Sequence, residues 1–235
     1  MKTKILIVLI LVFGIPVKAY IKPDDSLKIK NLPLVITNAA IQNKDAPIVF
    51  FISGDGGWFH FEQTIANDLA RRGIPTIGLD SRKYFWNRRS PEETTSDMAE
   101  ALIYYAKIWK KDKFVLMGYS LGAEIIPFIA NRLPDGVKLK VEATVLLSPD
   151  ITTDFEIHFT NMMGIGNRQN TYNTIPELIK MQNIPTLLIF GDGEKTKVPV
   201  LLSGTRIKIV KIPGDHHYKS NMPLIIKTIS DNTVL

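Results

Sequence analysis

The order of apolar runs along this chain limits its fold more than any other feature. Short runs rich in β-branched and aromatic residues alternate with longer segments whose apolar residues recur at helical spacing. The clearest pair is Ile48–Ser53, which predicts a buried strand, and Phe59–Arg72, which predicts a helix. Strands joined by helices pair in parallel, and the helices then cover both faces of the sheet. The sequence therefore predicts an α/β fold with a mostly parallel sheet.

The same alternation continues to the end of the chain. We expect further strands at Pro75–Asp80, Lys113–Gly118, Val141–Leu147, Pro185–Phe190 and Arg206–Ile212, and further helices at Pro91–Lys110, Leu121–Leu133, Ile175–Met181 and Met222–Ser230. Residues 20–46 are expected to add one or two antiparallel edge strands, such as Leu34–Ile36. The irregular stretch between Asp150 and Tyr172 is either a small cap or a long loop.

The first residues have the three-part layout of a secretory signal. A positive start, Met1–Lys4, precedes the apolar run Ile5–Phe13, and Val17-Lys18-Ala19 places small residues where a signal peptidase reads. We expect a signal peptide over residues 1–19, export to the periplasm, and one domain over residues 20–235. The run is too short for a helix across a bilayer of ~30 Å, and a retained N-terminal anchor is the alternative.

Charge and cysteine content exclude several classes of protein. The net charge of +6 falls to about +3 without the three lysines of the predicted signal peptide. This mild charge permits peripheral contact with an anionic membrane surface, whereas the lack of a basic stripe interleaved with aromatic residues argues against nucleic-acid binding. The chain has no cysteine, so disulfides and thiolate metal sites are excluded, and we expect no metal and no cofactor. A disulfide-free exported protein fits a bacterial periplasm.

The sequence Gly118-Tyr119-Ser120-Leu121-Gly122 has the pattern G-x-S-x-G. It follows a predicted strand and leads directly into a predicted helix, which is the context of the nucleophile elbow in the α/β-hydrolase fold. We therefore expect Ser120 to be a nucleophile and the backbone amide of Leu121 to donate to an oxyanion. The alternative is a glycine-rich turn with an inert serine.

A nucleophilic serine needs a base and an acid, and both have competing candidates. His216 and His217 follow the last predicted strand; only one can be the base, and the Asp-His-aromatic arrangement favours His216. Glu194 is the favoured acid because it lies three residues after Gly191 in a loop that follows a buried strand. Asp192 competes with it, and Asp150 is a third candidate.

The glycine-rich loop Ser53–Trp58 follows the first strong strand. In α/β-hydrolases this loop supplies the second oxyanion amide, and glycine lets the backbone approach the substrate closely. Gly56 or Gly57 is the expected donor. A phosphate-binding loop is the rival interpretation, but no Lys-Ser/Thr pair follows the glycines.

Several of these segments together resemble the VirJ/AcvB family of bacterial virulence proteins. The resemblance rests on SGDGGW at 53–58, GLDSRKYFWNRRSPEET at 78–94, GYSLGAEIIPF at 118–128, FGDGEKT at 190–196 and PGDHHY at 213–218. It implies an exported α/β-hydrolase linked to virulence and type IV secretion, with Ser120, Glu194 and either His216 or His217 as the triad. For the AcvB branch it also implies hydrolysis of lysyl-phosphatidylglycerol, an aminoacylated membrane lipid.

The resemblance leads to further expectations about substrate. Trp58, Tyr84 and Trp86 are candidates to meet a lipid headgroup, with Arg88-Arg89 near its phosphate, although the same aromatic residues could simply pack under the loop. Asp55, Asp150 or Glu156 would pair the lysyl ammonium. The competing functions are a generic carboxylesterase or thioesterase, and a non-catalytic periplasmic factor that binds secreted proteins for a secretion system.

Overall fold

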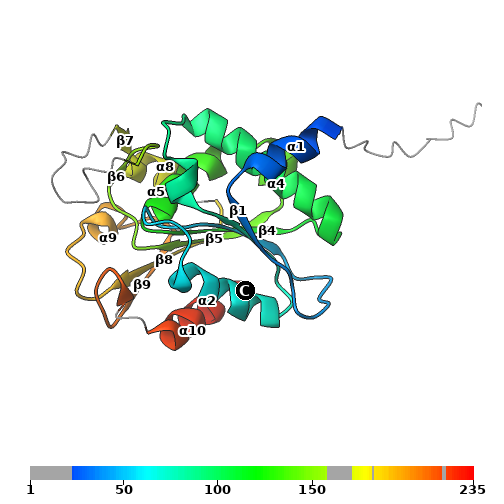
Figure 1. Ribbon diagram of the computed structural model, residues 1–235. Coiled ribbons are helices and arrows are strands. Elements are labelled where there is room, and N and C mark those ends of the chain that lie inside the picture. Colours follow the sequence, from blue (N-terminus) through cyan, green and yellow to red (C-terminus); the bar gives the residue numbers. More distant parts are fainter. Residues whose placement is uncertain (1–22, 158–170, 182, 219–220) are drawn as a thin grey trace, which may run out of the picture.

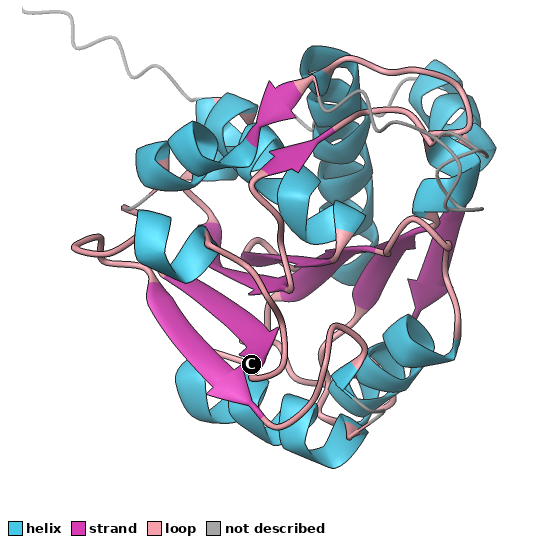
Figure 2. Ribbon diagram, turned by 90° about the vertical axis from the view of Figure 1, so that its left-hand side faces the viewer, coloured by secondary structure: helices cyan, strands magenta, loops and turns pink. Residues whose placement is uncertain are grey.

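A seven-stranded sheet lies at the centre of the computed structural model, which describes residues 23–157, 171–181, 183–218 and 221–235. Its strand order is β1-β3-β2-β4-β5-β8-β9. Every neighbouring pair is parallel except β1 and β3, so the sheet is mostly parallel, as predicted. Helices cover both of its faces (Figures 1 and 2).

The strands of the main sheet are close to the predicted ranges. They are β1 (Leu34–Thr37), β2 (Ile48–Ile52), β3 (Thr76–Leu79), β4 (Phe114–Tyr119), β5 (Val141–Leu147), β8 (Thr186–Gly191) and β9 (Lys208–Ile212). The expected antiparallel edge strand is β1. A separate antiparallel pair consists of β6 (Thr152–Thr153) and β7 (Tyr172–Asn173), within the stretch expected to be a cap or a loop.

All five predicted helices are present among the described residues, together with four that were not predicted. They are α1 (Pro23–Asn31), α2 (His60–Arg71), α3 (Ser81–Tyr84), α4 (Pro91–Trp109), α5 (Leu121–Arg132), α6 (Asp135–Lys138), α8 (Thr174–Lys180), α9 (Val198–Leu201) and α10 (Met222–Asn232). The first helix, α1, was not predicted. The one-turn helices α3, α6 and α9 are too short to show a helical period in the sequence.

Alternation of side chains along each strand divides the core between the two faces of the sheet. In β2, Phe50 and Ile52 belong to one apolar cluster, and Val49 and Phe51 belong to the other. Helices α1, α4, α5 and α8 cover the first face, and α2 and α10 lie side by side on the second (Figure 1). Each central strand is buried on both sides, which explains why most of its residues are apolar on both faces.

The register of the sheet sets the carboxyl ends of the central strands level with one another. Ile52 is paired with Gly118, Leu147 with Ile189, and Gly191 with Ile212. The loops that follow β2, β4, β8 and β9, which carry polar or glycine-rich sequence, therefore leave the sheet at one edge. This edge is where ligands bind in open α/β sheets.

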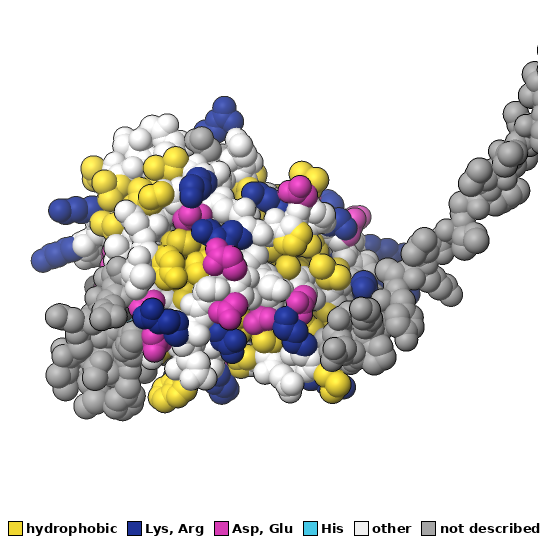
Figure 3. All heavy atoms as spheres, turned by 90° about the horizontal axis from the view of Figure 1, so that it is seen from above, with side chains coloured by type: hydrophobic (Ala, Val, Ile, Leu, Met, Phe, Trp, Pro, Cys, Tyr) yellow, Lys and Arg dark blue, Asp and Glu magenta, His cyan; other side chains and the backbone are white. Residues whose placement is uncertain are grey.

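Two further features concern the helices and the surface of the described residues. None of the helices among them is both long and apolar enough to cross a bilayer. On the face in Figure 3, which lies above the sheet of Figure 1, lysine and arginine side chains are interspersed with acidic ones. The predicted signal peptide at residues 1–19 lies outside the described residues.

Candidate active site

Ser120 occupies the sharp turn between β4 and α5. Its backbone has φ +50° and ψ −118°, a strained conformation for a residue with a side chain. A Cβ at Gly118 would lie 2.4 Å from the backbone of Gly122, and a Cβ at Gly122 would lie 2.1 Å from the carbonyl oxygen of Ile52. Glycine is therefore required on both sides of the serine, which accounts for the G-x-S-x-G pattern.

His216 is the histidine that reaches this serine. Its Nε2 lies 3.0 Å from Oγ of Ser120, within hydrogen-bonding distance. His217 points elsewhere, and its Nδ1 lies 2.9 Å from the hydroxyl of Tyr119. The structure thus separates the two histidines that the sequence left as alternatives, and it brings His216 to Ser120.

Glu194 is the carboxylate that reaches the histidine. Its Oε2 lies 3.1 Å from Nδ1 of His216, and its side chain is 9% exposed. Asp192 instead accepts a 3.0 Å hydrogen bond from the amide of Gly214, and exposed Asp150 accepts one from the amide of Ile151. Of the three candidate acids, Glu194 is the one that the structure places beside His216.

The loop that carries Glu194 and the loop that carries His216 approach each other closely through their backbones. A Cβ at Gly191 would lie 2.3 Å from the carbonyl oxygen of Asp215, so a side chain at this position would force the loops apart. The amides of Asp192 and Gly193 bond to the carbonyls of Ile212 and Gly214. Glu194 and His216 therefore belong to loops that are fixed to each other by backbone contacts.

The electrostatics of the pair suit a base oriented by a carboxylate. The hydrogen bond that His216 donates to Glu194 raises the pKa of His216 above 6.5, although partial burial opposes the rise. Burial alone would raise the pKa of Glu194, but the hydrogen bonds from His216, Ser148 and the Gly191 amide together lower it. Glu194 is therefore ionised at neutral pH and holds His216 with Nε2 toward the serine.

A hollow of about 560 Å³ opens in front of Ser120. Its other lining residues are Gly54, Asp55, Gly56, Gly57, Phe59, Phe61, Glu62, Tyr119, His216 and His217. Leu121 is the first residue of α5, so its amide has no acceptor within the helix and is in place for the predicted oxyanion role. Of the two predicted glycine donors, Gly57 already donates to the carbonyl of Gly54, which leaves Gly56 as the better candidate.

The family of the chain follows from a comparison of sequences. Residues 46–234 match the model of a family described as "Bacterial virulence protein (VirJ)". The chain belongs to the VirJ family. The match covers every candidate catalytic residue, and it confirms the resemblance that the sequence motifs indicated. No curated protein matches the sequence.

Solved structures with the same architecture as this VirJ-family protein are α/β-hydrolases. Est1E from Butyrivibrio proteoclasticus, solved with bound ferulic acid, is 14% identical with a TM-score of 0.64 over 85% of this chain and 93% of its own. An alpha-beta serine hydrolase homologue from Coxiella burnetii is 16% identical with a TM-score of 0.58, over 85% and 90%. An esterase domain from a Rhodothermus marinus protein is 14% identical with a TM-score of 0.59, over 84% and 90%. These matches confirm the predicted fold class.

The structure corrects part of the predicted substrate contacts in this VirJ-family chain. Tyr84 is 2% exposed and donates a 2.6 Å hydrogen bond to Asp97, so the prediction that it meets the substrate is wrong. Phe85 is also in the core. Both residues follow a strand end, but the turn of α3 directs them inward, which the sequence does not reveal. The aromatic residue of this run that remains exposed is Trp86.

The other predicted contacts are divided between the site and the scaffold. Asp55 lines the hollow beside Ser120. Trp58 packs edge-on against Phe51 at 5.4 Å, and its indole donates to Gln63 at 2.9 Å, so most of its ring has a structural role. Arg88 pairs with Glu156 at 2.8 Å, so this candidate partner of the lysyl ammonium already has a cationic partner in the chain.

Sequence reasoning missed two residues that support the acid. Ser148 directly follows β5, and its Oγ lies 2.6 Å from Oε1 of Glu194. The hydroxyl of fully buried Tyr218 lies 2.6 Å from the same Oγ and 2.9 Å from the carbonyl of Ile189. The signal was present for both, because Ser148 ends a strand at the site edge and Tyr218 is the aromatic residue after the two histidines. Among the described residues, no group of histidine and acidic side chains is arranged to hold a metal.

Proposed function

We propose that this VirJ-family protein is a serine esterase. The observation that carries the proposal is the row Ser120–His216–Glu194, with contacts of 3.0 and 3.1 Å, at an open hollow and a strained elbow. A protein that only binds a partner has no need of a strained serine within reach of an oriented base.

The chemistry has two steps. In the first, Oγ of Ser120 attacks the ester carbonyl while Nε2 of His216 takes the hydroxyl proton, and the amide of Leu121 donates to the oxyanion. His216 then gives the proton to the departing alcohol, which leaves an acyl-serine. In the second step, water attacks the acyl-serine with His216 again as the base, and Ser120 is restored.

A fluorophosphonate probe tests the proposal because it labels only an activated serine. We expect labelling of the protein and its loss in Ser120→Ala, with hydrolysis of any cleaved ester falling on the order of 10⁶-fold. Ser203→Ala is the matched control, since Ser203 is exposed in the turn after α9. An unlabelled wild-type protein would favour the non-catalytic secretion factor, and near-normal turnover by Ser120→Ala would exclude the triad mechanism.

The substrate that we propose is lysyl-phosphatidylglycerol, as the resemblance to the AcvB branch implies. Two carboxylates, Asp55 and Glu62, line the hollow beside Ser120 and suit a cationic acyl group. Both oxygens of Glu62 accept backbone bonds, from Gly54 at 3.3 Å and Phe59 at 3.1 Å, so this buried side chain holds the loop. We assign recognition of the lysyl ammonium to Asp55.

The test compares lysine and alanine release from lysyl- and alanyl-phosphatidylglycerol in mixed micelles. Losing one charged contact in a desolvated site costs ~2–5 kcal/mol, so a preference for the lysyl lipid of at least tenfold is expected. Asp55→Asn should remove the preference, whereas Asp112→Asn, exposed at the opposite edge of the sheet, should retain it. Equal rates on the two lipids would exclude recognition of the ammonium. Cleavage of a simple ester without lysine release would leave the esterase and exclude this substrate.

We also propose that the chain is exported and cleaved after Ala19. Support comes from the layout of residues 1–19, which lie outside the described part of the structure. N-terminal sequencing of the protein from a periplasmic fraction should begin at Tyr20, and Ala19→Glu should block the cleavage. A periplasmic protein that begins at Met1 would instead indicate a retained anchor.

A further inference from the structure

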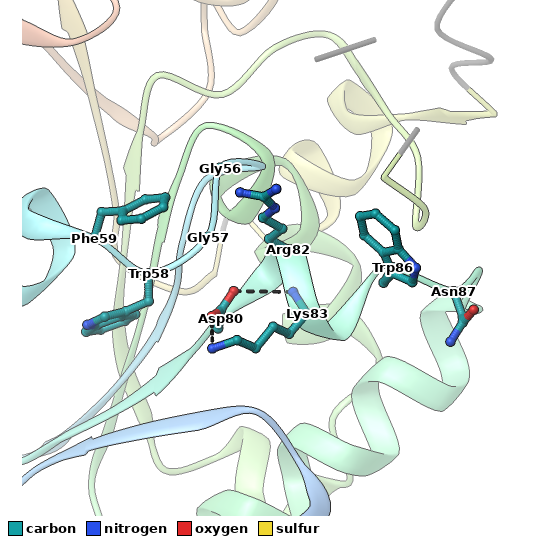
Figure 4. A pocket seen from close by; sticks show the side chains of 9 residues that line it. All are labelled: Gly56, Gly57, Trp58, Phe59, Asp80, Arg82, Lys83, Trp86 and Asn87. Atoms are coloured by element: carbon teal, nitrogen blue, oxygen red, sulfur yellow. Dashed lines mark hydrogen bonds and ion pairs between the residues drawn. The ribbon is translucent and has the colours of Figure 1, made fainter. Parts of the chain in front are cut away.

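A second hollow of about 520 Å³ lies beside the one at Ser120. Its lining is Gly56, Gly57, Trp58, Phe59, Asp80, Arg82, Lys83, Trp86 and Asn87 (Figure 4). Gly56, Gly57 and Phe59 line both hollows. The two hollows therefore adjoin at the Gly56–Gly57 turn, which also carries a predicted oxyanion donor, and we call the pair of hollows the trough.

The two halves of the trough differ in charge. The residues that line the Ser120 half include Asp55 and Glu62 and, among the described residues, no lysine or arginine. The other half contains Arg82 and Lys83 with one carboxylate, Asp80. A molecule that lies along the trough thus meets acidic groups near the serine and basic groups beyond the glycine turn.

Arg82 is the cation of this half that is left for a ligand. Nζ of Lys83 pairs with Asp80 at 2.8 Å, and in Figure 4 Lys83 turns back toward that carboxylate. Arg82 rises on the side of Gly56, and it forms no ion pair within the described part of the chain. Phe59 and Trp86 stand on either side of it in Figure 4, and they are 61% and 54% exposed.

The fold fixes Arg82 relative to the catalytic loop. Arg82 belongs to α3, whose first residue Ser81 is fully buried. The amide of Ser81 donates to Oγ of Ser53 at 3.0 Å, and its hydroxyl donates to the carbonyl of Gly54. At the other end of α3, Tyr84 is tied to α4 through Asp97. Arg82 is therefore carried by a turn that is hydrogen-bonded to the Ser53–Trp58 loop.

We propose that this half of the trough is the subsite for the alcohol portion of the ester, and that Arg82 binds a phosphate diester anion carried by that alcohol. The guanidinium presents a planar fork that matches two phosphate oxygens. The exposed rings of Phe59 and Trp86 give the carbon chain of the alcohol an apolar surface on each side. The proposal rests on the esterase function assigned to Ser120.

One experiment compares two soluble esters that differ in the charge of the alcohol. They are 3-butyryloxypropanol and 3-butyryloxypropyl methyl phosphate, and neither contains lysine or a lipid. We expect kcat/KM to be about tenfold higher for the phosphate ester, through KM. Arg82→Gln should bring the ratio of the two kcat/KM values to about one, and Arg82→Lys should restore part of it.

The control is Arg71→Gln, which removes the same charge at the far end of α2, where Arg71 pairs with Asp68. It should keep the wild-type ratio. A wild-type ratio of one, or a ratio that is unchanged in Arg82→Gln, would overturn the proposal while leaving the esterase intact. Since each variant is judged by its own ratio, partial loss of folded protein does not affect the result.

A second measurement does not depend on catalysis. We expect 3-hydroxypropyl methyl phosphate, the alcohol released from the phosphate ester above, to change the tryptophan fluorescence of the full chain, and the change to be lost in Trp86→Phe and in Arg82→Gln. Binding that persists in Arg82→Gln would overturn the proposal. Inorganic phosphate that binds as tightly as 3-hydroxypropyl methyl phosphate would also overturn it, because the site would then recognise an isolated anion and not an alcohol portion. Binding without hydrolysis or fluorophosphonate labelling would instead reject the esterase function.

Discussion

Ser148 donates a 2.6 Å hydrogen bond to Oε1 of Glu194, the oxygen opposite to the one that faces His216. Ser148 itself has a left-handed backbone with φ +51°, and its Oγ also contacts the hydroxyl of Tyr218. The contact joins the end of β5 to the loops that follow β8 and β9. The acid of the candidate triad is thus held by a buried serine as well as by backbone.

Replacing Ser148 tests whether this contact positions the acid. A hydrogen bond to a charged group contributes about 1.5–3 kcal/mol, so Ser148→Ala should lower kcat roughly 10- to 100-fold with little change in KM. It should also lower the pKa seen in the acid limb of the pH–rate profile, because a less firmly held carboxylate stabilises protonated His216 less well. Ser203→Ala is the control. If Ser148→Ala loses the expected amount of kcat but keeps the wild-type pH–rate profile, the role of Ser148 is purely structural.

The two histidines should differ sharply in their effect on turnover. His216→Ala removes the base and should reduce kcat to a residual rate, whereas His217→Ala removes a contact with Tyr119 and should cost less than about tenfold, the scale of one neutral hydrogen bond. Steady-state kinetics on one ester, with circular dichroism to check folding, measures both. A greater loss of kcat in His217→Ala than in His216→Ala would indicate that His217 is the base.

The two acids of the 191–194 loop should differ in the same way. In Glu194→Gln the amide favours the wrong histidine tautomer, and turnover should fall ~10⁴-fold. Asp192→Asn keeps an oxygen that can accept the bond from Gly214, so its effect should be small. The result that contradicts this assignment is a severe loss in Asp192→Asn with near-normal Glu194→Gln.

The pH dependence of kcat/KM should show the influence of Glu194 on His216. The base must be neutral to take the serine proton, so activity is lost as pH falls through the pKa of His216. Because Glu194 raises that pKa, the inflection of the acid limb should lie above 6.5. In Glu194→Gln the burial of His216 remains without the carboxylate, so the residual activity should have its inflection at lower pH. An inflection at the same pH in wild type and Glu194→Gln would show that Glu194 does not influence the pKa of His216.

Local sequence determined most of the fold and the candidate nucleophile. The buried strands are short and mostly apolar, as in the five residues of β2, and the helices begin and end at signals such as the Ser90–Pro91 cap and Pro134. The elbow at Ser120 is partly local, because a side chain at Gly118 would meet the backbone of Gly122, whereas Gly122 is required by the close approach of Ile52 from a neighbouring strand. Helix α1 escaped prediction because it is short and polar, with no strong apolar period.

Only the tertiary structure decided between residues that are adjacent in sequence. His216 and His217 follow the same strand, and Asp192 and Glu194 occupy the same turn, so strand order could not separate them. The choice depends on the direction in which each side chain leaves a loop packed against another loop, as Gly191 is packed against Asp215. The inward turn of Tyr84 and the outward position of Arg82 have the same origin. Such directions are set by contacts between segments far apart in the chain, which no local pattern of residues encodes.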